Sequence, residues 1–145
     1  MKYFVIYLKS TGAIIRWGTN PLLDIAVLET STEAALEVDN SEITSDTHYV
    51  ESGSLKAKET KPSQYYKFNY TTKEWEADTP HCLMLLRIDR DNLLSKSDWT
   101  QIADCQLSDT KKAEWVTYRQ QLRDLPSSYP NLANLDDVTW PTQPS

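Results

Sequence analysis

The spacing of apolar residues changes once along the chain, near Thr79 and Pro80, and this change most constrains the fold. Before it, apolar and polar residues alternate with the period of two that is typical of β-strands. After it, leucines recur at the three- and four-residue spacing of an amphipathic helix. The two periods predict an α+β chain, with a small β-rich domain over residues 1–79, a helical hairpin over residues 80–126 and an extended proline-rich tail over residues 127–145.

The first hairpin of the β-rich domain is predicted around Gly12, because alternating runs flank this glycine. On the first of these runs, Phe4, Ile6 and Leu8 form the expected apolar face, and the opposite face is more amphipathic. Pro21 interrupts the pattern after the second run.

The rest of the first half supplies further short strands. Residues 31–39 fit either a strand or a short helix that leads into one, and residues 48–52 and 53–59 predict two strands. Residues 65–78 predict a hairpin that turns near Thr71. Its aromatic side chains are expected to meet across the two strands, with Tyr66, Phe68 and Tyr70 opposite Trp75.

The first predicted helix has apolar residues on more than one face. One stripe consists of Leu83, Leu86, Leu93 and Leu94. Met84, Leu85 and Ile88 lie off this stripe, so we expect them to pack outside the helical pair, on the first domain or on a partner.

Arg90 lies within the leucine stripe, where an unpaired charge is costly. Two interpretations remain open. The guanidinium pairs with Asp98 or Asp104 in the following polar segment, or the side chain extends past the leucines into water.

The second helix is predicted to begin after Ser108, which is a good N-cap, and to end at Pro126. Its apolar arc consists of Trp115, Tyr118, Leu122 and Leu125. Proline interrupts the tail repeatedly, yet the tail carries apolar residues that we expect to lie along a surface: Tyr129, Leu132, Leu135, Val138 and Trp140.

No motif for catalysis, metal binding or cofactor binding is present. His81 and Cys82 are adjacent, His48 and Cys105 stand alone, and neither zinc spacing nor a supported cysteine nucleophile results. With three glycines in the chain, no glycine-rich phosphate loop is possible. We therefore expect no enzyme and no cofactor.

Charge and hydropathy narrow the possible partners. The formal net charge of −6 argues against nucleic acid or an anionic membrane as the main partner. No apolar run approaches the roughly 20 residues that cross a bilayer, and the apolar start of the chain is too short for a signal peptide. The expected place of synthesis is a cytoplasm.

Residues 85–126 resemble the helical-hairpin module of phage tail assembly chaperone-like and tail-fibre-associated proteins. The resemblance depends on an Arg-x-x-Arg helix that runs into two leucines, then Ser-Asp-Trp-Thr-Gln over residues 97–101, then Trp-x-x-Tyr-Arg from Trp115 and Leu-Arg-Asp-Leu-Pro over residues 122–126. The closing Trp-Pro of residues 140–141 is similar as well. Cys105 is not part of this pattern.

The resemblance implies a protein of phage tail or tail-fibre assembly that works by protein–protein contact. The first expectation is a structural adaptor in the virion that connects a fibre to the baseplate or tail, in an oligomeric assembly. One alternative is a transient chaperone that is absent from the virion, and a weaker one is a carbohydrate-binding module of a fibre.

Residue types that dominate interfaces suggest the contacts. Trp99, on the polar segment, is the best candidate, and Trp115, Tyr118 and Leu122 are expected to hold the helices together. Because a virion enters an oxidising medium, Cys82 or Cys105 is a candidate for a disulfide to a neighbouring protein. The partner-binding candidates are Trp99, Asp98, Gln101, Arg119, Arg123, Met84 and Ile88.

Overall fold

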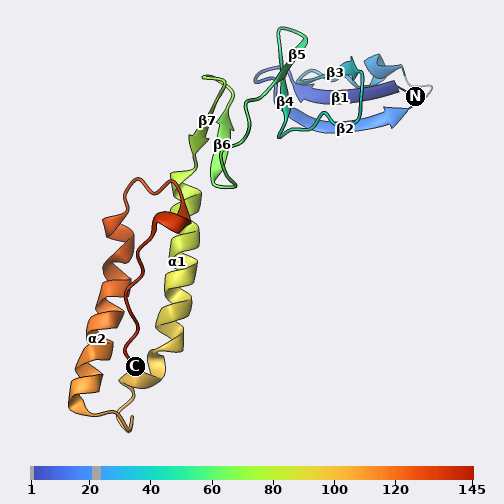
Figure 1. Cartoon of the computed structure of the whole chain (residues 1–145). Coiled ribbons are helices and arrows are strands. Elements are labelled where there is room, and N and C mark those ends of the chain that lie inside the picture. Colours follow the sequence, from blue (N-terminus) through green and yellow to red (C-terminus); the bar gives the residue numbers. More distant parts are fainter. Residues whose placement is uncertain (1, 21–23) are drawn as a thin grey trace. The chain divides into compact units, whose positions relative to one another are not determined.

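The computed structural model describes residues 2–20 and 24–145, and the chain divides into two compact units, Met1–Glu76 and Ala77–Ser145. Strands fill nearly all of the regular structure of the first unit and helices fill that of the second (Figure 1). The α+β fold class predicted from the sequence is therefore confirmed. The interruption predicted at Pro21 lies outside the described residues.

An antiparallel sheet with the strand order β2-β1-β3 forms the first part of the N-terminal unit. Its strands are β1 (Lys2–Leu8), β2 (Ile14–Asn20) and β3 (Glu33–Val38). The hairpin predicted around Gly12 is confirmed, and this residue has a φ of 77°, which favours glycine. A Cβ at Gly12 would also lie 1.8 Å from the carbonyl oxygen of Val50, so a side chain cannot fit.

The segment that the sequence left between strand and helix is strand β3, which pairs with β1 along its length. A short 3-10 helix, η1 (Ile25–Leu28), precedes it, and the Asp24 side chain caps this helix by accepting a hydrogen bond from the Ala26 N–H. Pairing with the central strand satisfies the β3 backbone groups that face β1, so tertiary contact decides against the helix.

The first strand buries residues on both faces, which corrects the predicted orientation. Val5 is 0% exposed and belongs to the main core, although the sequence placed it on the more amphipathic face. Ile6, on the predicted apolar face, is 2% exposed. The buried members of the main core are Val5, Ile14, Ile43 and Val50.

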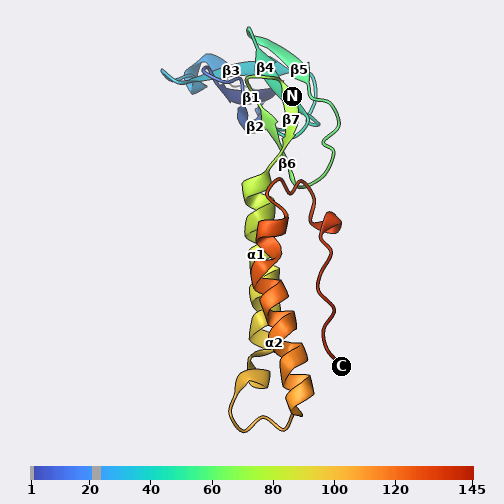
Figure 2. The same ribbon diagram turned by 90° about the vertical axis from the view of Figure 1, so that its left-hand side faces the viewer.

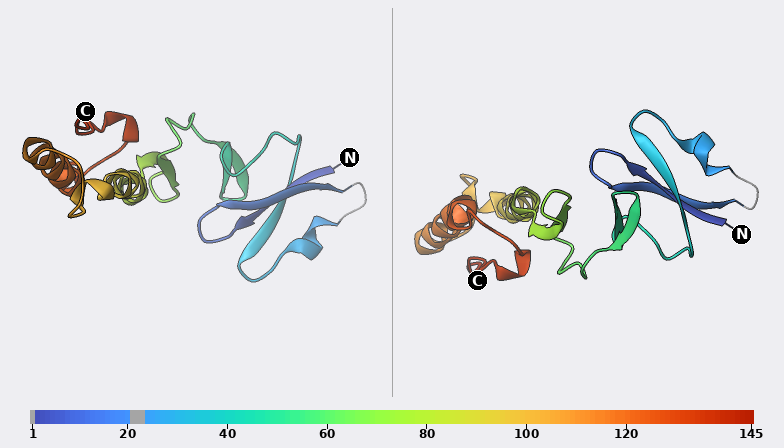
Figure 3. Two further views of the ribbon diagram at one scale, coloured as in Figure 1. Left: turned by 90° about the horizontal axis from the view of Figure 1, so that it is seen from below. Right: turned by 90° about the horizontal axis from the view of Figure 1, so that it is seen from above.

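Two further hairpins complete the N-terminal unit, and the sequence predicted the strands of the first and the whole of the second. Strands β4 (His48–Glu51) and β5 (Ser54–Ala57) form the first. Strands β6 (Tyr66–Asn69) and β7 (Glu74–Ala77) form the second. Figure 3 shows these strands from two directions.

The aromatic contacts of the last hairpin centre on Phe68. Its ring centroid lies 5.1 Å from that of Tyr70, 5.3 Å from that of Trp75 and 5.4 Å from that of Tyr49. The ammonium group of Lys58 lies 4.2 Å from the centre of the Phe68 ring. The hairpin thus forms a small aromatic cluster together with Tyr49 of β4, and Lys58 places a cation against it.

Two helices that lie side by side and run in opposite directions form the C-terminal unit (Figure 2). Helix α1 (Thr79–Lys96) begins after Asp78, whose side chain accepts a hydrogen bond from the backbone N–H of His81. Leu86 of this helix is 0% exposed. No helix in residues 2–20 and 24–145 combines the length and hydrophobicity that crossing a membrane requires.

Helix α2 (Asp109–Asp124) begins after Ser108, as predicted, because the Ser108 side chain accepts a hydrogen bond from the Lys111 N–H. The helix ends at Asp124, two residues before Pro126. Its buried side chains Trp115, Tyr118 and Leu122 form one cluster, against which Leu93, Leu94, Leu107 and Trp140 pack.

After α2 the chain forms two short 3-10 helices, η3 (Leu125–Ser128) and η4 (Leu135–Asp137), and then runs along the helix pair to its end. Leu132 and Val138 are buried, which ties this segment to the unit. The Asn134 side chain caps η4 by accepting a hydrogen bond from the Asp136 N–H.

Candidate protein-interaction site

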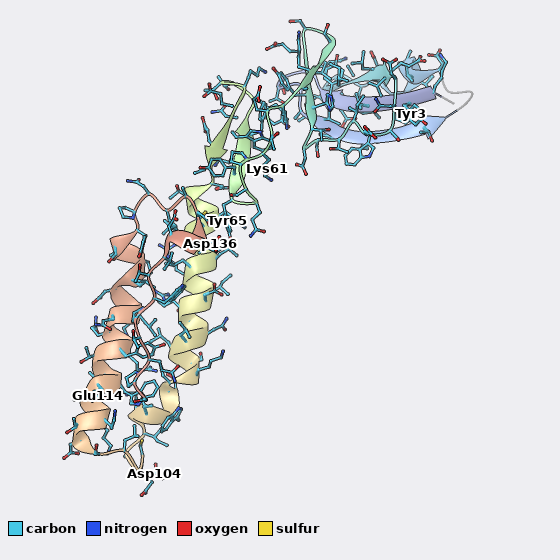
Figure 4. All side chains as sticks on the ribbon, in the orientation of Figure 1. Tyr3, Lys61, Tyr65, Asp104, Glu114 and Asp136 are labelled. Atoms are coloured by element: carbon cyan, nitrogen blue, oxygen red, sulfur yellow. The ribbon has the colours of Figure 1, made fainter. Side chains whose placement is uncertain are left out.

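The loop that joins α1 to α2, residues 97–108, is called the elbow below. It contains one turn of 3-10 helix, η2 (Asp98–Gln101). Figure 4 labels Asp104 in the elbow and Asp136 at the opposite end of the helix pair. This loop carries three of the seven residues that the sequence suggests for partner binding, Asp98, Trp99 and Gln101.

Arg119 of α2 holds the elbow in place. Its Nη1 donates hydrogen bonds to the Leu94 carbonyl oxygen at 2.7 Å and to Ser97 Oγ at 2.6 Å, and its Nη2 donates to Asp98 Oδ1 at 2.7 Å. One guanidinium thereby satisfies a carbonyl at the end of α1, which has no partner within that helix, and pairs with a carboxylate. The residue is 8% exposed, so the sequence-based placement of Arg119 at a partner surface is corrected.

Ser97 is the second fixed point of the elbow, and it is 2% exposed. Its hydroxyl donates to the Leu93 and Leu94 carbonyl oxygens at 3.0 and 2.9 Å. Its own carbonyl oxygen accepts hydrogen bonds from the Thr100 N–H and hydroxyl. The Leu93 and Leu94 carbonyl oxygens at the end of α1 therefore accept hydrogen bonds from side chains. These bonds fix the geometry of the turn that carries Trp99.

Trp99 lies at the surface end of a row of aromatic rings. Its ring centroid is 5.9 Å from that of Trp115, and the Trp115 centroid is 5.6 Å from that of Tyr118, both in edge-on contact. Trp115 and Tyr118 are 6% and 3% exposed, whereas Trp99 is 51% exposed. The inner rings, Trp115 and Tyr118, hold the helices together. The outer ring, Trp99, contacts Trp115 on one side, and about half of its surface stays in solvent.

Five exposed side chains of the elbow are together called the elbow surface: Asp98, Trp99, Gln101, Ile102 and Asp104. Ile102 is 54% exposed, so an aliphatic group lies three residues from the tryptophan. The carboxylates of Asp98 and Asp104 give the surface acidic groups beside its apolar ones.

The other predicted contact residues lie away from the elbow surface. Met84 and Ile88, one turn apart on α1, are 48% and 50% exposed. Arg123 lies in the last turn of α2 and is exposed. The structure therefore brings Asp98, Trp99 and Gln101 together in the elbow. It places the other predicted contact residues on the helices: Met84, Ile88 and Arg123.

Arg90 does not pair with either aspartate of the elbow. Its guanidinium forms an ion pair at 2.8 Å with Asp91, the next residue in the chain, and its side chain is 20% exposed. Asp98, which the sequence offered as its partner, pairs with Arg119 instead. Because Asp91 pairs with the Arg90 guanidinium, Arg90 does not need an ion pair with a residue of the elbow.

The two cysteines are free thiols that lie near opposite ends of α1. Cys82 lies a helix rise of about 20 Å from Lys96 at the end of α1, Cys105 lies beyond that end in the elbow, and no bridge joins the two thiols. Cys82 is 0% exposed, and burial followed by the nearby Asp78 charge raises the pKa of its thiol. Cys105 is partly exposed in the elbow.

Sequence reasoning missed the roles of Arg119, Ser97 and Ile102. A signal for Arg119 was present, because it follows Trp115 by four residues and precedes Leu122 by three, which places it on the buried arc of α2. Ser97 and Ile102 carried no comparable signal, since their burial and exposure follow from the path of the loop.

The comparison with protein families decides what kind of unit this is. Residues 83–145 match the family model described as phage tail assembly chaperone protein. The C-terminal unit belongs to this family. The match takes in nearly all of that unit but less than half of the chain, and the N-terminal unit lies outside it. Comparisons with curated proteins and with solved structures gave no match.

Residues 83–145 are called the chaperone module below. The family description gives the chain a role in phage tail assembly, as the sequence predicted, and it names no reaction. Such a role implies contact with other phage tail proteins and synthesis in the infected host cell.

Proposed function

We propose that the elbow surface is where the chaperone module binds another protein of the phage tail. The observation that carries this proposal is Trp99, which keeps half of its surface in solvent although a buried cluster lies directly beneath it. Tryptophan is strongly enriched among residues that dominate binding energy. Its support is rigid, because Arg119 and Ser97 fix the turn, so little conformational entropy is lost on binding.

The charges around Trp99 specify the surface that would bind it. Asp98 keeps a side-chain exposure of 66% even while it pairs with Arg119, and Asp104 forms no ion pair within the described residues. A partner with an apolar pocket for Trp99 and Ile102, flanked by lysine or arginine, would be complementary. We expect such binding to weaken as the salt concentration rises.

Within tail assembly, we favour a chaperone that holds a tail or tail-fibre protein and is released before the virion is complete. The family description supports this choice. A structural adaptor that stays in the virion is the second candidate, and the N-terminal unit favours it. That unit exposes Trp17 at 48% and Ile15 at 38%, which offers a second apolar surface for a second protein.

Pairwise co-expression with each tail and tail-fibre protein of the same phage tests the proposal. A stable complex that forms through the elbow surface is the expected result, and no complex with any of these proteins would contradict it. Mass spectrometry of purified virions then separates the candidates. A chaperone leaves no peptides of this chain in the particle, whereas an adaptor leaves a fixed number of copies.

The remaining predicted contacts are proposed as secondary ones. Met84 and Ile88 offer a small apolar area on α1, and Arg123 offers an exposed cation at the end of α2. Of the two thiols, Cys105 is the one that a partner's cysteine can reach, because Cys82 is buried. A non-reducing gel of the complex would show a covalent link as a band at the summed mass.

A further inference from the structure

Residues 139–145 are called the strap below. They lie along the two helices of the chaperone module, outside the elbow. They run beside the helix pair from the end of α2 back toward its start (Figures 1 and 2). The strap begins beside Asp124 and Leu125, and its last residues lie beside Glu114 and Thr117. It therefore runs antiparallel to α2, over the groove between the helices.

One side chain anchors the strap. Trp140 packs against the cluster of Trp115, Tyr118 and Leu122. At the start of the strap, the Thr139 N–H donates a hydrogen bond to the Tyr129 hydroxyl at 2.8 Å. After Trp140, none of the residues 141–145 forms a hydrogen bond with the part of the chain that the structure describes.

The groove is wider than the strap. A cleft of about 490 Å³ remains on the α1 side, where Asp89, Leu93 and Lys96 form the wall. Another of about 530 Å³ remains on the α2 side, where Glu114 and Gln121 form the wall. Open clefts on both sides leave the strap with the packing of a surface contact, unlike the close packing of a protein interior, and another chain can replace such a contact.

The strap itself shows which ligand the groove accepts. Pro141 and Pro144 favour an extended backbone and donate no hydrogen bonds, and Trp140 supplies an aromatic anchor ahead of them. Recognition of extended proline-containing peptides in aromatic-lined grooves is a general mode of protein binding. Tyr118 is a shared wall of both clefts, which supplies the aromatic surface.

We infer that the groove under the strap is a peptide-binding site, which the strap fills until a partner displaces it. The ligand is an extended segment of another tail protein, in which an aromatic residue is followed directly by proline. The strap competes at high effective concentration because it is tethered, so the partner's segment must bind more tightly than the strap does. This site is separate from the elbow surface and does not depend on it.

A synthetic peptide of residues 136–145 tests the inference against two receptors. One is the chain shortened to residues 1–138, and the other is the full chain with Trp140→Ala, which keeps the rest of the strap. We expect the peptide to bind both receptors at least tenfold more tightly than it binds the unaltered chain. A control peptide with Trp140→Ala should bind at least tenfold more weakly than the natural one.

Several outcomes would overturn the inference. One is no binding to either receptor while the helical circular dichroism is intact. Equal binding to all three chains would place the peptide elsewhere, and loss of helical structure in both receptors would make the strap part of the fold. If the full chain is a dimer and the shortened chain a monomer, the strap is exchanged between two copies, and a partner's segment is not its replacement.

Discussion

The two units each contain an aromatic cluster with a cation beside it, partly buried in the first and buried in the second, and the two clusters differ in how they end. In the N-terminal unit, the ammonium group of Lys58 lies over the rings of Phe68 and Tyr70, at 4.2 and 4.8 Å from their centres. It also donates a hydrogen bond to the Ser45 carbonyl oxygen at 2.6 Å. The rings of this cluster pack against one another and against Lys58, and each ring is at least partly buried.

In the chaperone module, the cation bonds the elbow and makes no cation–π contact among the residues that the structure describes. Arg119 bonds the backbone and side chains of the elbow, and the row of rings ends at the half-exposed Trp99. Aromatic residues next to a cation therefore serve as a closed core in one unit and present a surface in the other. The position of the cation separates the two cases: Lys58 covers the rings, whereas Arg119 supports the turn that exposes one.

The largest effect is expected from Trp115→Ala, because this ring is 6% exposed at the centre of the helical cluster. We predict that the free energy of unfolding of the module falls by about 3 kcal/mol or more. Urea unfolding followed by helical circular dichroism measures it. Val116→Ala, at a neighbouring position that is 53% exposed, is the control and should change stability by less than about 0.5 kcal/mol. Equal effects would show that the row of rings is not the core.

A somewhat smaller loss is expected from Arg119→Met. The change removes the hydrogen bonds to Leu94, Ser97 and Asp98 and leaves a buried carbonyl with fewer partners. The predicted cost is about 2–3 kcal/mol of unfolding free energy, measured as for Trp115→Ala. Arg123→Met is the matched control, because Arg123 is exposed on the same helix, and it should be nearly neutral. A neutral Arg119→Met would remove Arg119 from its proposed role in the elbow.

Lys58→Met should cost the N-terminal unit about 1 kcal/mol, less than the loss of Arg119 costs the module. The substitution gives up the cation–π contacts and the bond to Ser45, but a thioether still packs well against aromatic rings. Lys56→Met, at an exposed position of β5, is the control. Thermal unfolding followed at Trp75 reports on this unit. A loss as large as that of Arg119→Met would mean that Lys58 stabilises its unit as much as Arg119 stabilises the module. The proposed difference between the two cations would then be wrong.

The smallest effect concerns alkaline pH. Burial raises the pKa of Tyr118 above its ordinary 10.0, so the folded module keeps a proton that the unfolded chain has released. Its stability is therefore unchanged below that pH and falls as the pH rises above it. In the N-terminal unit, burial raises the pKa of Tyr70 but lowers the pKa of Lys58, and the two contributions oppose each other.

Fluorine NMR of protein labelled with 5-fluorotryptophan can follow Trp115 and Trp75 separately through this pH range. The Trp115 signal should report unfolding at lower denaturant concentration as the pH rises, while the Trp75 signal changes less. Tyr118→Phe should remove part of the difference. Greater sensitivity at Trp75 would reverse the comparison.

Local signals in the sequence were sufficient for most elements of the fold. The cap at Ser108, the turn at Gly12 and the two strands within residues 48–59 depend on nearby residues, and the structure confirms them. The orientation of β1 was not predictable in the same way, because Val5 is buried by Ile43 and Val50, which are distant in sequence.

The elbow was only partly predictable, for a related reason. The sequence suggested Trp99 as a surface residue, and the structure leaves it half exposed, but its role in binding stays a prediction. One of the two interpretations of Arg90 paired it with Asp98 or Asp104, whereas Asp98 pairs with Arg119, because pairing across 21 residues depends on how the loop folds back. Arg90 instead pairs with the nearest acidic neighbour.

The central claim is that Trp99 serves binding and not folding, and the affinity of the chain for its tail-protein partner tests it most directly. Trp17→Ala is the matched control, since Trp17 is 48% exposed and belongs to the other unit. Calorimetric titration should show that Trp99→Ala weakens binding by about 2 kcal/mol or more, roughly thirtyfold, while the module loses less than about 1 kcal/mol of stability. Trp17→Ala should leave this affinity unchanged. If Trp99→Ala binds like the unaltered chain, or destabilises the module as much as Trp115→Ala does, then Trp99 belongs to the core and the elbow surface is not the binding site.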